Sequence, residues 1–214
     1  GLVKFPFGEA RELESEEARE PFKLNGTMIA VGGGKDSLTT IEILKQQLIE
    51  DQKNKSLKDK KSFPLGKGWD GGALSTWSVG HGELFAPMLE TIGLPHTEVK
   101  RKICPNLLNL YKSNQLTSQP ANPPFNGHVP ISAILAFSSV ITALLTGKKY
   151  IALSNESSAN EANVEMYGMK INHQYSKTLE FEQDFQSYVT KNISNQVQYF
   201  SFLRPLKEIQ IAQN

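Results

Sequence analysis

A glycine-rich segment at residues 28–37 constrains the fold of this chain more than any other feature of its sequence. Residues 28–31 are apolar and typical of a strand, whereas an amphipathic segment typical of a helix begins near residue 36. The turn between them and the first helical residues would be formed by Gly32, Gly33, Gly34, Lys35, Asp36 and Ser37. Glycines let a ligand approach the backbone, and a helix N-terminus offers unpaired amides and a favourable dipole to a phosphate. The segment therefore predicts a phosphate-binding loop between a buried parallel strand and a helix.

Three side chains of this loop would add their own chemistry. Lys35 supplies a mobile positive charge, Ser37 a hydroxyl group, and Asp36 a carboxylate that could bind magnesium. The spacing differs from the dinucleotide fingerprint and from the Walker loop, because the lysine directly follows three glycines and precedes an aspartate. A glycine-rich turn without any ligand is the alternative interpretation.

Length and composition are those of an enzyme with one sizeable core. The chain has 214 residues and a formal net charge of +1, so we expect one main domain and no general attraction to nucleic acid or membrane. Cys104 is the only cysteine, which excludes an internal disulfide and a cysteine-rich metal site. The sequence has no signal peptide and no apolar run of about 18 residues, so it predicts a cytoplasmic enzyme without a membrane partner.

Both ends and one internal stretch differ from the rest of the chain. Residues 1–24 are charged and irregular, which predicts an N-terminal arm, and residues 51–72 are polar and rich in lysine and glycine, which predicts a flexible loop. The chain begins with Gly1 and its last residues resemble an unfinished helix, so we expect flanking segments of a longer protein. Residues 25–214 would form the phosphate-binding domain.

Strand-like and helix-like segments alternate along this domain. The expected strands lie at 27–31, 74–79, 96–103 and 149–153, and the expected helices at 36–50, 84–92, 106–112 and 131–146. This alternation after a phosphate loop predicts an α/β fold with a doubly wound, mainly parallel sheet. Ligands of such sheets bind at the carboxyl ends of the strands, so the loops after Val31, Val79 and Leu153 should share one cleft. The helix at 131–146 is almost wholly apolar or small, and we expect it to be nearly buried.

Two polar stretches supply further candidate site residues. Residues 154–163 directly follow a predicted core strand, and Glu156 or Glu161 could bind magnesium there. Residues 171–177 carry an imidazole, a phenol and an amine suited to acid–base chemistry, although a polar surface turn is the alternative. His128 precedes the apolar helix and could cap it or contact a bound anion. The expected substrate contacts from the two stretches are Asn155, Glu156, Ser157, Asn160, Asn172, Gln174 and Ser176.

The phosphate loop resembles the Ser-Gly-Gly-x-Asp-Ser loop of the PP-loop ATP pyrophosphatases, with Gly32 where the first serine commonly stands. Members of that superfamily cleave ATP between its α and β phosphates. Four further segments stand in the order found in one branch of the superfamily, at residues 126–132, 152–161, 172–177 and 202–206. From about residue 27 onward, the chain resembles the UDP-N-acetylmuramoyl-L-alanyl-L-glutamate epimerase family. Its lysine-rich segment near residue 55 and its short ends depart from that family.

The resemblance implies an ATP- and Mg²⁺-dependent isomerase of peptidoglycan synthesis that acts on a small nucleotide-peptide. The α-carboxylate of the terminal L-glutamate would be adenylated, and its α-proton removed and returned on the other face. The products would be the D-glutamate epimer, AMP and pyrophosphate. Residues 32–37 would bind the phosphates of ATP, and Asp36 and Glu156 the metal ion. The candidate proton carriers, which the sequence does not rank, are His128, His173, Tyr175 and Lys177.

Two other classes of protein fit part of this pattern. Another PP-loop adenylating enzyme, such as an amide ligase or a nucleobase- or tRNA-modifying enzyme, would use the same phosphate loop. Sulfur insertion often relies on paired cysteines, and Cys104 stands alone, which disfavours tRNA thiolation. A tRNA partner would also favour a more basic surface than a net charge of +1 provides. A non-catalytic nucleotide sensor is the other class, and the dense polar segments at several strand ends argue against it.

Overall fold

The fold is built on a parallel sheet, as the sequence predicts. This computed structural model describes residues 23–53, 73–80, 82–102, 104–105, 130–162 and 164–213. Its five-stranded sheet has the order β3-β2-β1-β4-β7, and every neighbouring pair is parallel. The strands are β1 (Thr27–Ala30), β2 (Leu74–Val79), β3 (His96–Val99), β4 (Tyr150–Leu153) and β7 (Gln198–Ser201). The predicted helix at 106–112, residues 1–22 of the arm, residues 54–72 of the loop and His128 lie outside the described residues.

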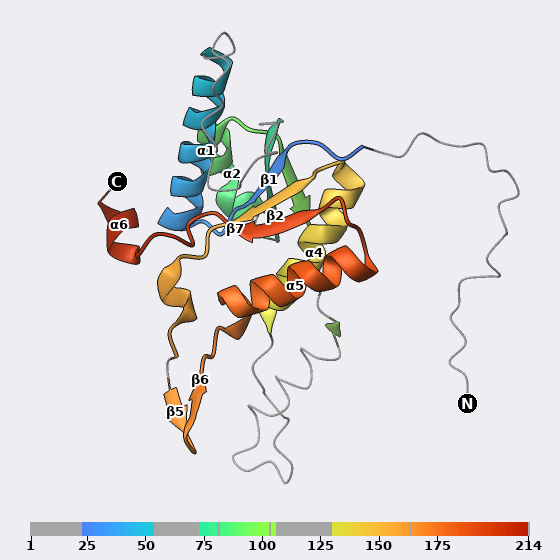
Figure 1. The fold of residues 1–214 in the computed structure, drawn as a ribbon. Helices are drawn as coiled ribbons and strands as arrows, with labels where there is room; N and C mark the ends of the chain where they lie inside the picture. The colour runs from blue at the N-terminus through green and yellow to red at the C-terminus, as the bar shows by residue number, and fades with distance from the viewer. Residues whose placement is uncertain are drawn as a thin grey trace, which may run out of the picture.

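Helices cover both faces of the sheet, so the predicted doubly wound α/β fold is confirmed (Figure 1). The helices are α1 (Lys35–Lys53), α2 (Gly82–Ile92), α4 (Ile131–Thr146), α5 (Leu179–Asn192) and the short α6 (Glu208–Ala212). Two 3₁₀ turns, η1 (Ser157–Asn160) and η2 (Tyr175–Lys177), flank a hairpin of β5 (Val164–Met166) and β6 (Met169–Ile171). In Figure 1 this hairpin extends away from the sheet.

The two faces of β1 explain how the layers are held together. Successive side chains of a strand point to opposite faces. Met28 packs in a buried cluster with residues of α4 and α5, whereas Ile29 packs with Ile41 and Leu44 of α1. Leu24 is also buried in the first of these clusters, so the last part of the predicted arm belongs to the core.

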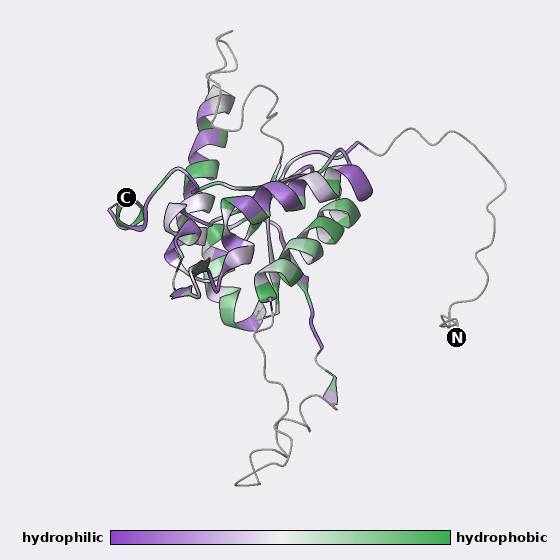
Figure 2. Ribbon diagram, turned by 60° about the horizontal axis from the view of Figure 1, so that its bottom comes forward, coloured by the Kyte–Doolittle hydropathy of each residue, from purple (hydrophilic) through white to green (hydrophobic). Residues whose placement is uncertain are grey.

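The expectation that α4 is nearly buried is wrong for its outer side. Ala136, Val140 and Ala143 pack against the sheet, but Ile141 is 58% exposed and Leu145 is 81% exposed. Figure 2 shows the hydrophobic colour running along this helix. The sheet can cover only one side of a helix, and the other described elements leave the opposite side of α4 uncovered. Even so, none of the described helices combines the length and apolar character needed to span a bilayer.

Several element boundaries differ from the prediction. Helix α1 continues through Lys53 into the stretch expected to be a loop, and β3 ends at Val99 rather than at residue 103. Helix α5 and strand β7 were not among the elements expected from the sequence. Strand β7 pairs with β4 and forms the sheet edge opposite β3.

The sheet order identifies where a ligand would bind. The chain runs from β1 outward through β2 to β3, and then crosses to β4 on the other side of β1. The order of the strands thus reverses between β1 and β4. In doubly wound sheets, the crevice at the carboxyl ends of the two strands that flank such a reversal is the usual ligand site.

Candidate functional site

The glycine loop joins β1 to α1 at this reversal. Gly33 has a φ of +76°, a left-handed conformation that favours glycine. A Cβ atom there would lie 2.6 Å from Cε1 of Phe85, so α2 packs directly against the loop backbone. By contrast, a Cβ at Gly32 or Gly34 would meet no atom within 4 Å. The loop therefore has one glycine that the fold requires and two that leave space beside the backbone.

Replacing Gly33 by alanine should destabilise the domain, because the new residue would be held at positive φ and would collide with Phe85. Such strain costs about 1–3 kcal/mol. We expect urea unfolding to show a loss of this size. Gly32→Ala is the matched control, because its Cβ would enter open space, and its unfolding free energy should stay within about 0.5 kcal/mol of the wild type. Equal stability of the two variants would contradict this interpretation of Gly33.

The first residues of α1 form the rest of the predicted phosphate site. Their amides have no acceptor within the helix, as at any helix start. Ser37 is buried, and its Oγ donates to the carbonyl oxygen of Gly34 at 2.9 Å, so this hydroxyl braces the loop. Nζ of Lys35 lies 3.0 Å from Oε1 of Glu208 in α6 and 3.1 Å from Oδ1 of Asp36. Hydrogen bonds to Glu208 and Asp36 raise the pKa of Lys35, which favours its cationic form.

Asp36 has an oxygen whose bonding capacity the fold does not fill. Its Oδ1 is buried and accepts no well-aligned hydrogen bond from the described residues, although the Lys35 ammonium is near. Buried polar atoms are normally paired, so an exception needs an explanation. A bound cation or a hydrogen-bond donor of a ligand would satisfy this oxygen.

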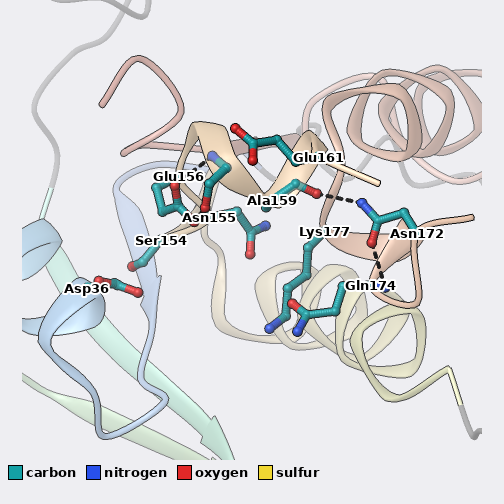
Figure 3. Close-up of a pocket in the computed structure, with 10 residues that line it drawn as sticks. Asp36, Ser154, Asn155, Glu156, Ala159, Glu161, Asn172, Gln174 and Lys177 are labelled. Carbon is teal, nitrogen blue, oxygen red and sulfur yellow. Dashed lines mark hydrogen bonds between the residues drawn. The ribbon is translucent and has the colours of Figure 1, made fainter. Parts of the chain in front are cut away.

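A polar pocket opens beside Asp36. Its walls come from the start of α1, the loop after β4, η1 and the segment leading into η2 (Figure 3). The lining residues are Asp36, Ser154, Asn155, Glu156, Ser158, Ala159, Glu161, Asn172, Gln174 and Lys177. The structure thus brings together the start of α1 and the loop after β4, which are more than a hundred residues apart in the sequence. They were expected to share one cleft because each follows the carboxyl end of a core strand. No described residue of the loop after Val79 lines the pocket, because β2 lies on the side of β1 away from β4.

Hydrogen bonds hold the first wall of the pocket in place. Oγ1 of Thr40 lies 3.0 Å from the backbone oxygen of Asp36 and 2.9 Å from Oγ of Ser154, which connects α1 to the end of β4. The carboxylate of Glu156 accepts from the backbone N–H of Ser158 at 2.7 Å and from its Oγ at 2.6 Å, and so caps η1. A carboxylate has about four lone-pair directions, so Glu156 retains capacity for another partner.

Some residues predicted to touch substrate instead connect the walls. Asn160 accepts from the backbone N–H of Leu179 at 2.6 Å, which joins η1 to the start of α5. Asn172 donates to the backbone oxygen of Ala159 at 2.8 Å, although it also lines the pocket. Ser157 and Ser176 are half-buried in the two 3₁₀ turns and do not line the pocket. Ser154 and Ser158 belong to the polar stretch that was expected to line the cleft, whereas Thr40 was not expected there, because no local pattern marks it as a link to the end of β4.

The candidate proton carriers lie in different surroundings. Lys177 lines the pocket, and Figure 3 shows its side chain extending into the same space as that of Gln174. His173 is exposed, with Nε2 lying 3.2 Å from Nε2 of Gln174, and it does not line the pocket. Tyr175 is also exposed, and its ring packs edge-on against Phe181 with 6.1 Å between the ring centroids. Of these three groups, the geometry places only Lys177 where a pocket ligand would be.

The carboxylates of the pocket suit a magnesium ion that phosphate helps to hold. The described residues contain no group of three or more His, Cys, Asp and Glu side chains able to bind a metal on their own. Magnesium, however, is usually bound by one or two carboxylates together with water and substrate phosphates. The buried Oδ1 of Asp36, which has the Lys35 ammonium at 3.1 Å but no well-aligned hydrogen bond from the described residues, fits this requirement, and Glu156 and Glu161 offer further carboxylates in the pocket lining.

These features define a doubly wound α/β protein with a polar, carboxylate-containing pocket at the reversal point of its sheet. The family model of the MurL N-terminal domain matches residues 70–202, which is more than half of the chain. The chain therefore belongs to the MurL N-terminal domain family.

Curated relatives are similar over most of the chain. A UDP-N-acetyl-alpha-D-muramoyl-L-alanyl-L-glutamate epimerase from Xanthomonas oryzae pv. oryzae is 31% identical over 86% of this chain and 34% of its own length. Proteins of the same name from Salinispora tropica and from a Micromonospora species are 31% and 29% identical, over 86% and 95% of this chain and 33% and 37% of their own lengths. The chain thus spans about a third of the length of these relatives.

Among solved structures, the U34-tRNA thiolase NcsA from Methanococcus maripaludis with its [4Fe-4S] cluster aligns with 91% of this chain and 57% of its own. The TM-score is 0.46 and the sequence identity 15%, a similarity too low to support a conclusion.

Proposed function

We propose that this chain carries the ATP-binding and epimerising site of a UDP-N-acetylmuramoyl-L-alanyl-L-glutamate epimerase, which acts in peptidoglycan synthesis. The supporting observation is that Asp36, in the first turn of the helix that follows the glycine loop, and the polar segments after β4 line one pocket, in a chain of the MurL N-terminal domain family. The pocket offers carboxylates, amides and an ammonium group within one space. Such a mixture suits a charged, multi-part substrate better than an apolar ligand.

ATP would bind as a substrate with its phosphates against the glycine loop, as in the PP-loop ATP pyrophosphatases. The open space beside Gly32 and Gly34 lets phosphate oxygens reach the backbone, and the N-terminus of α1 favours their charge. Lys35 is half-exposed and cationic, so it can exchange Glu208 for a phosphate. Asp36 and Glu156 would hold Mg²⁺, which would neutralise part of the phosphate charge.

Adenylation would make the glutamate α-proton removable. One α-carboxylate oxygen attacks the α-phosphorus of ATP, and pyrophosphate leaves with the electron pair of the broken P–O bond. The resulting acyl-adenylate lacks the negative charge that otherwise opposes formation of a carbanion at the adjacent carbon. A base takes the α-proton, the enolate oxygen is stabilised by oriented donors, and a proton returns to the opposite face. Water then cleaves the acyl-phosphate bond to give the D-glutamate epimer and AMP.

Each wall of the pocket has a part in this scheme. Asn155, Asn172 and Gln174 carry amide groups that can orient the peptide and donate to developing negative charge. Of the three candidate proton carriers that the structure describes, Lys177 is the best placed to face the glutamate α-carbon, because it lines the pocket whereas His173 and Tyr175 do not. We assign it removal of the α-proton, and the proton that enters from the opposite face would come from another donor or from water.

Product analysis tests the whole proposal. The protein would be incubated with ATP, magnesium and UDP-N-acetylmuramoyl-L-alanyl-L-glutamate, and the products analysed by mass spectrometry and by chirality of the released glutamate. We expect D-glutamate, AMP and pyrophosphate in equal amounts, and none of them when ATP is omitted. Cleavage of ATP that depends on an added amine, with all glutamate remaining in the L form, would instead identify an amide ligase.

A further inference from the structure

The turn after β7 places an arginine behind the pocket, where it contacts both of its walls. Nη1 of Arg204 donates to the backbone oxygen of Glu156 at 3.1 Å, in the wall that contains η1. Nη2 donates to the backbone oxygen of Lys177 at 2.9 Å, in the wall that contains η2. The same nitrogen lies 2.9 Å from Oε2 of Glu182 in α5, and both side chains of this ion pair are only 12% exposed.

The same turn makes further bonds to the η1 wall. The backbone N–H of Ser157 donates to the carbonyl oxygen of Leu206 at 2.9 Å. Oγ of Ser201, at the end of β7, accepts from Nδ2 of Asn155 at 2.9 Å and from Nη2 of Arg204 at 3.2 Å. The pocket wall after β4 is therefore attached to the neighbouring strand β7 through side-chain and backbone groups.

A buried ion pair is weak evidence for stability, because the cost of desolvation offsets much of the attraction. The Arg204–Glu182 pair is better explained by geometry. A guanidinium group is planar and presents its donors in fixed directions, so it can hold several acceptors at set positions. Here two of those acceptors are the backbone oxygens of Glu156, the candidate metal ligand, and of Lys177, the candidate proton carrier.

We propose that Arg204 is a positioning residue that sets the separation between the Glu156 wall and the Lys177 wall of the pocket. It touches neither the pocket nor, by this geometry, the substrate, since it binds the backbone behind both walls. The covalent link between the walls runs through the β5–β6 hairpin, which extends away from the sheet (Figure 1). Asn160 and Asn172 also connect the walls to each other, whereas Arg204 connects both of them to the turn after β7. The importance of Arg204 for catalysis rests on the proposed function, whereas its effect on the separation of the two walls does not.

Arg204→Lys tests the inference, because lysine keeps the charge beside Glu182 but cannot hold two separate backbone oxygens in a fixed fork. A small misplacement of catalytic groups can have large effects. We expect the dissociation constant of UDP-N-acetylmuramoyl-L-alanyl-L-glutamate to rise by about tenfold or more. ATP titrated without magnesium should bind within about twofold of the wild type, because Arg204 makes no contact with the glycine loop and the Glu156 wall would contact ATP only through the metal ion. Calorimetric titration measures both constants.

Hydrogen exchange measures the walls directly and needs no substrate. Arg204→Lys should speed the exchange of the Ser158 and Leu179 amides by about tenfold or more, and leave the β1 amides unchanged. Gln186→Leu is the matched control, because Gln186 accepts from the Tyr199 N–H at 2.6 Å and donates to the Val197 oxygen at 3.1 Å. It therefore joins α5 to the β7 region without reaching either wall, and its loss should not speed exchange in the walls.

The outcomes separate the inference from the proposed function. If the wild type does not bind the nucleotide-peptide but exchange in the walls responds as expected, the proposed function fails and the positioning role stands. Unchanged exchange in the walls of Arg204→Lys would overturn that role, and so would the same exchange pattern in Gln186→Leu. If Arg204→Lys does not fold, Glu182→Gln replaces it, because this change loosens the guanidinium by removing its charged partner. Hydrogen exchange of the wall amides and binding of the nucleotide-peptide are then measured on Glu182→Gln, with the same expected results.

Discussion

Replacing Asp36 by asparagine should reduce ATP-dependent pyrophosphate release by at least about a hundredfold, because a pocket carboxylate that would balance the charge of the magnesium ion would be lost. The Asp36 charge pairs in the fold with the Lys35 ammonium, and both side chains are more than a third exposed, so the pair contributes only about 0.2–1 kcal/mol to stability. Asparagine has nearly the same shape, and the variant should unfold at the same temperature as the wild type. Pyrophosphate release and thermal unfolding, measured on the same preparation, check both statements.

Glu42→Gln is the control for this change. Glu42 lies on the same helix, is exposed, and pairs with Lys45 at 3.1 Å outside the pocket. Exposed pairs of this kind contribute about 0.2–1 kcal/mol, so its loss should alter neither stability nor rate noticeably. A loss of pyrophosphate release in both variants would indicate a general effect of charge on α1. A wild-type rate in Asp36→Asn would contradict the placement of ATP.

Much of the fold could be predicted because its strands are locally distinctive. The strand expected at 74–79 and the helix expected at 131–146 have the same bounds in the structure. The strand consists of apolar and small hydroxyl residues and ends at Gly80, and the helix is almost wholly apolar or small between Pro130 and Gly147. Helix α5 was not predicted, although Phe181, Phe185 and Val189 recur at helical spacing and pack together against the core. A start signal was nevertheless present: Thr178 caps the helix by accepting from the backbone N–H of Phe181 at 3.2 Å.

The order of strands and helices in the sequence predicts which segments form the candidate site, but not which of their side chains face the pocket. The strand-end rule places Asp36 and Glu156 near one crevice, and the structure has both in the lining of one pocket. Which side chains of 171–177 face inward depends on long-range contacts, such as those of Asn172 with Ala159 and of Arg204 with the Lys177 backbone. No local pattern specifies such contacts. For the same reason, the sequence shows Arg204 only as part of a segment that resembles the epimerase family, and it does not predict that Arg204 links two walls of the pocket.

Replacing Lys177 by methionine should remove α-deuterium incorporation without removing ATP binding. If the reaction passes through an acyl-adenylate, turnover in heavy water exchanges the glutamate α-proton for deuterium through the base. Methionine keeps an unbranched side chain of similar length but has no proton to give or take. Loss of a general acid–base group costs about 10²–10⁴-fold in rate, so deuterium incorporation should fall by at least about a hundredfold. Mass spectrometry of the recovered glutamate measures it, and calorimetric titration measures ATP binding.

His173→Ala provides the comparison, because it removes the imidazole that the sequence offered as an equal candidate. His173 is exposed and does not line the pocket, so this variant should retain most of its deuterium incorporation. The opposite ranking, with His173→Ala inactive in exchange and Lys177→Met active, would assign proton transfer to the imidazole and require the η2 segment to rearrange when substrate binds. Exchange that survives in both variants would exclude both side chains and leave the proton to another group of the pocket. Lys177 can carry the proton only if its side chain and the glutamate α-carbon share one space, and Lys177 lines the same pocket as Asp36 and Glu156, the proposed ligands of the magnesium ion.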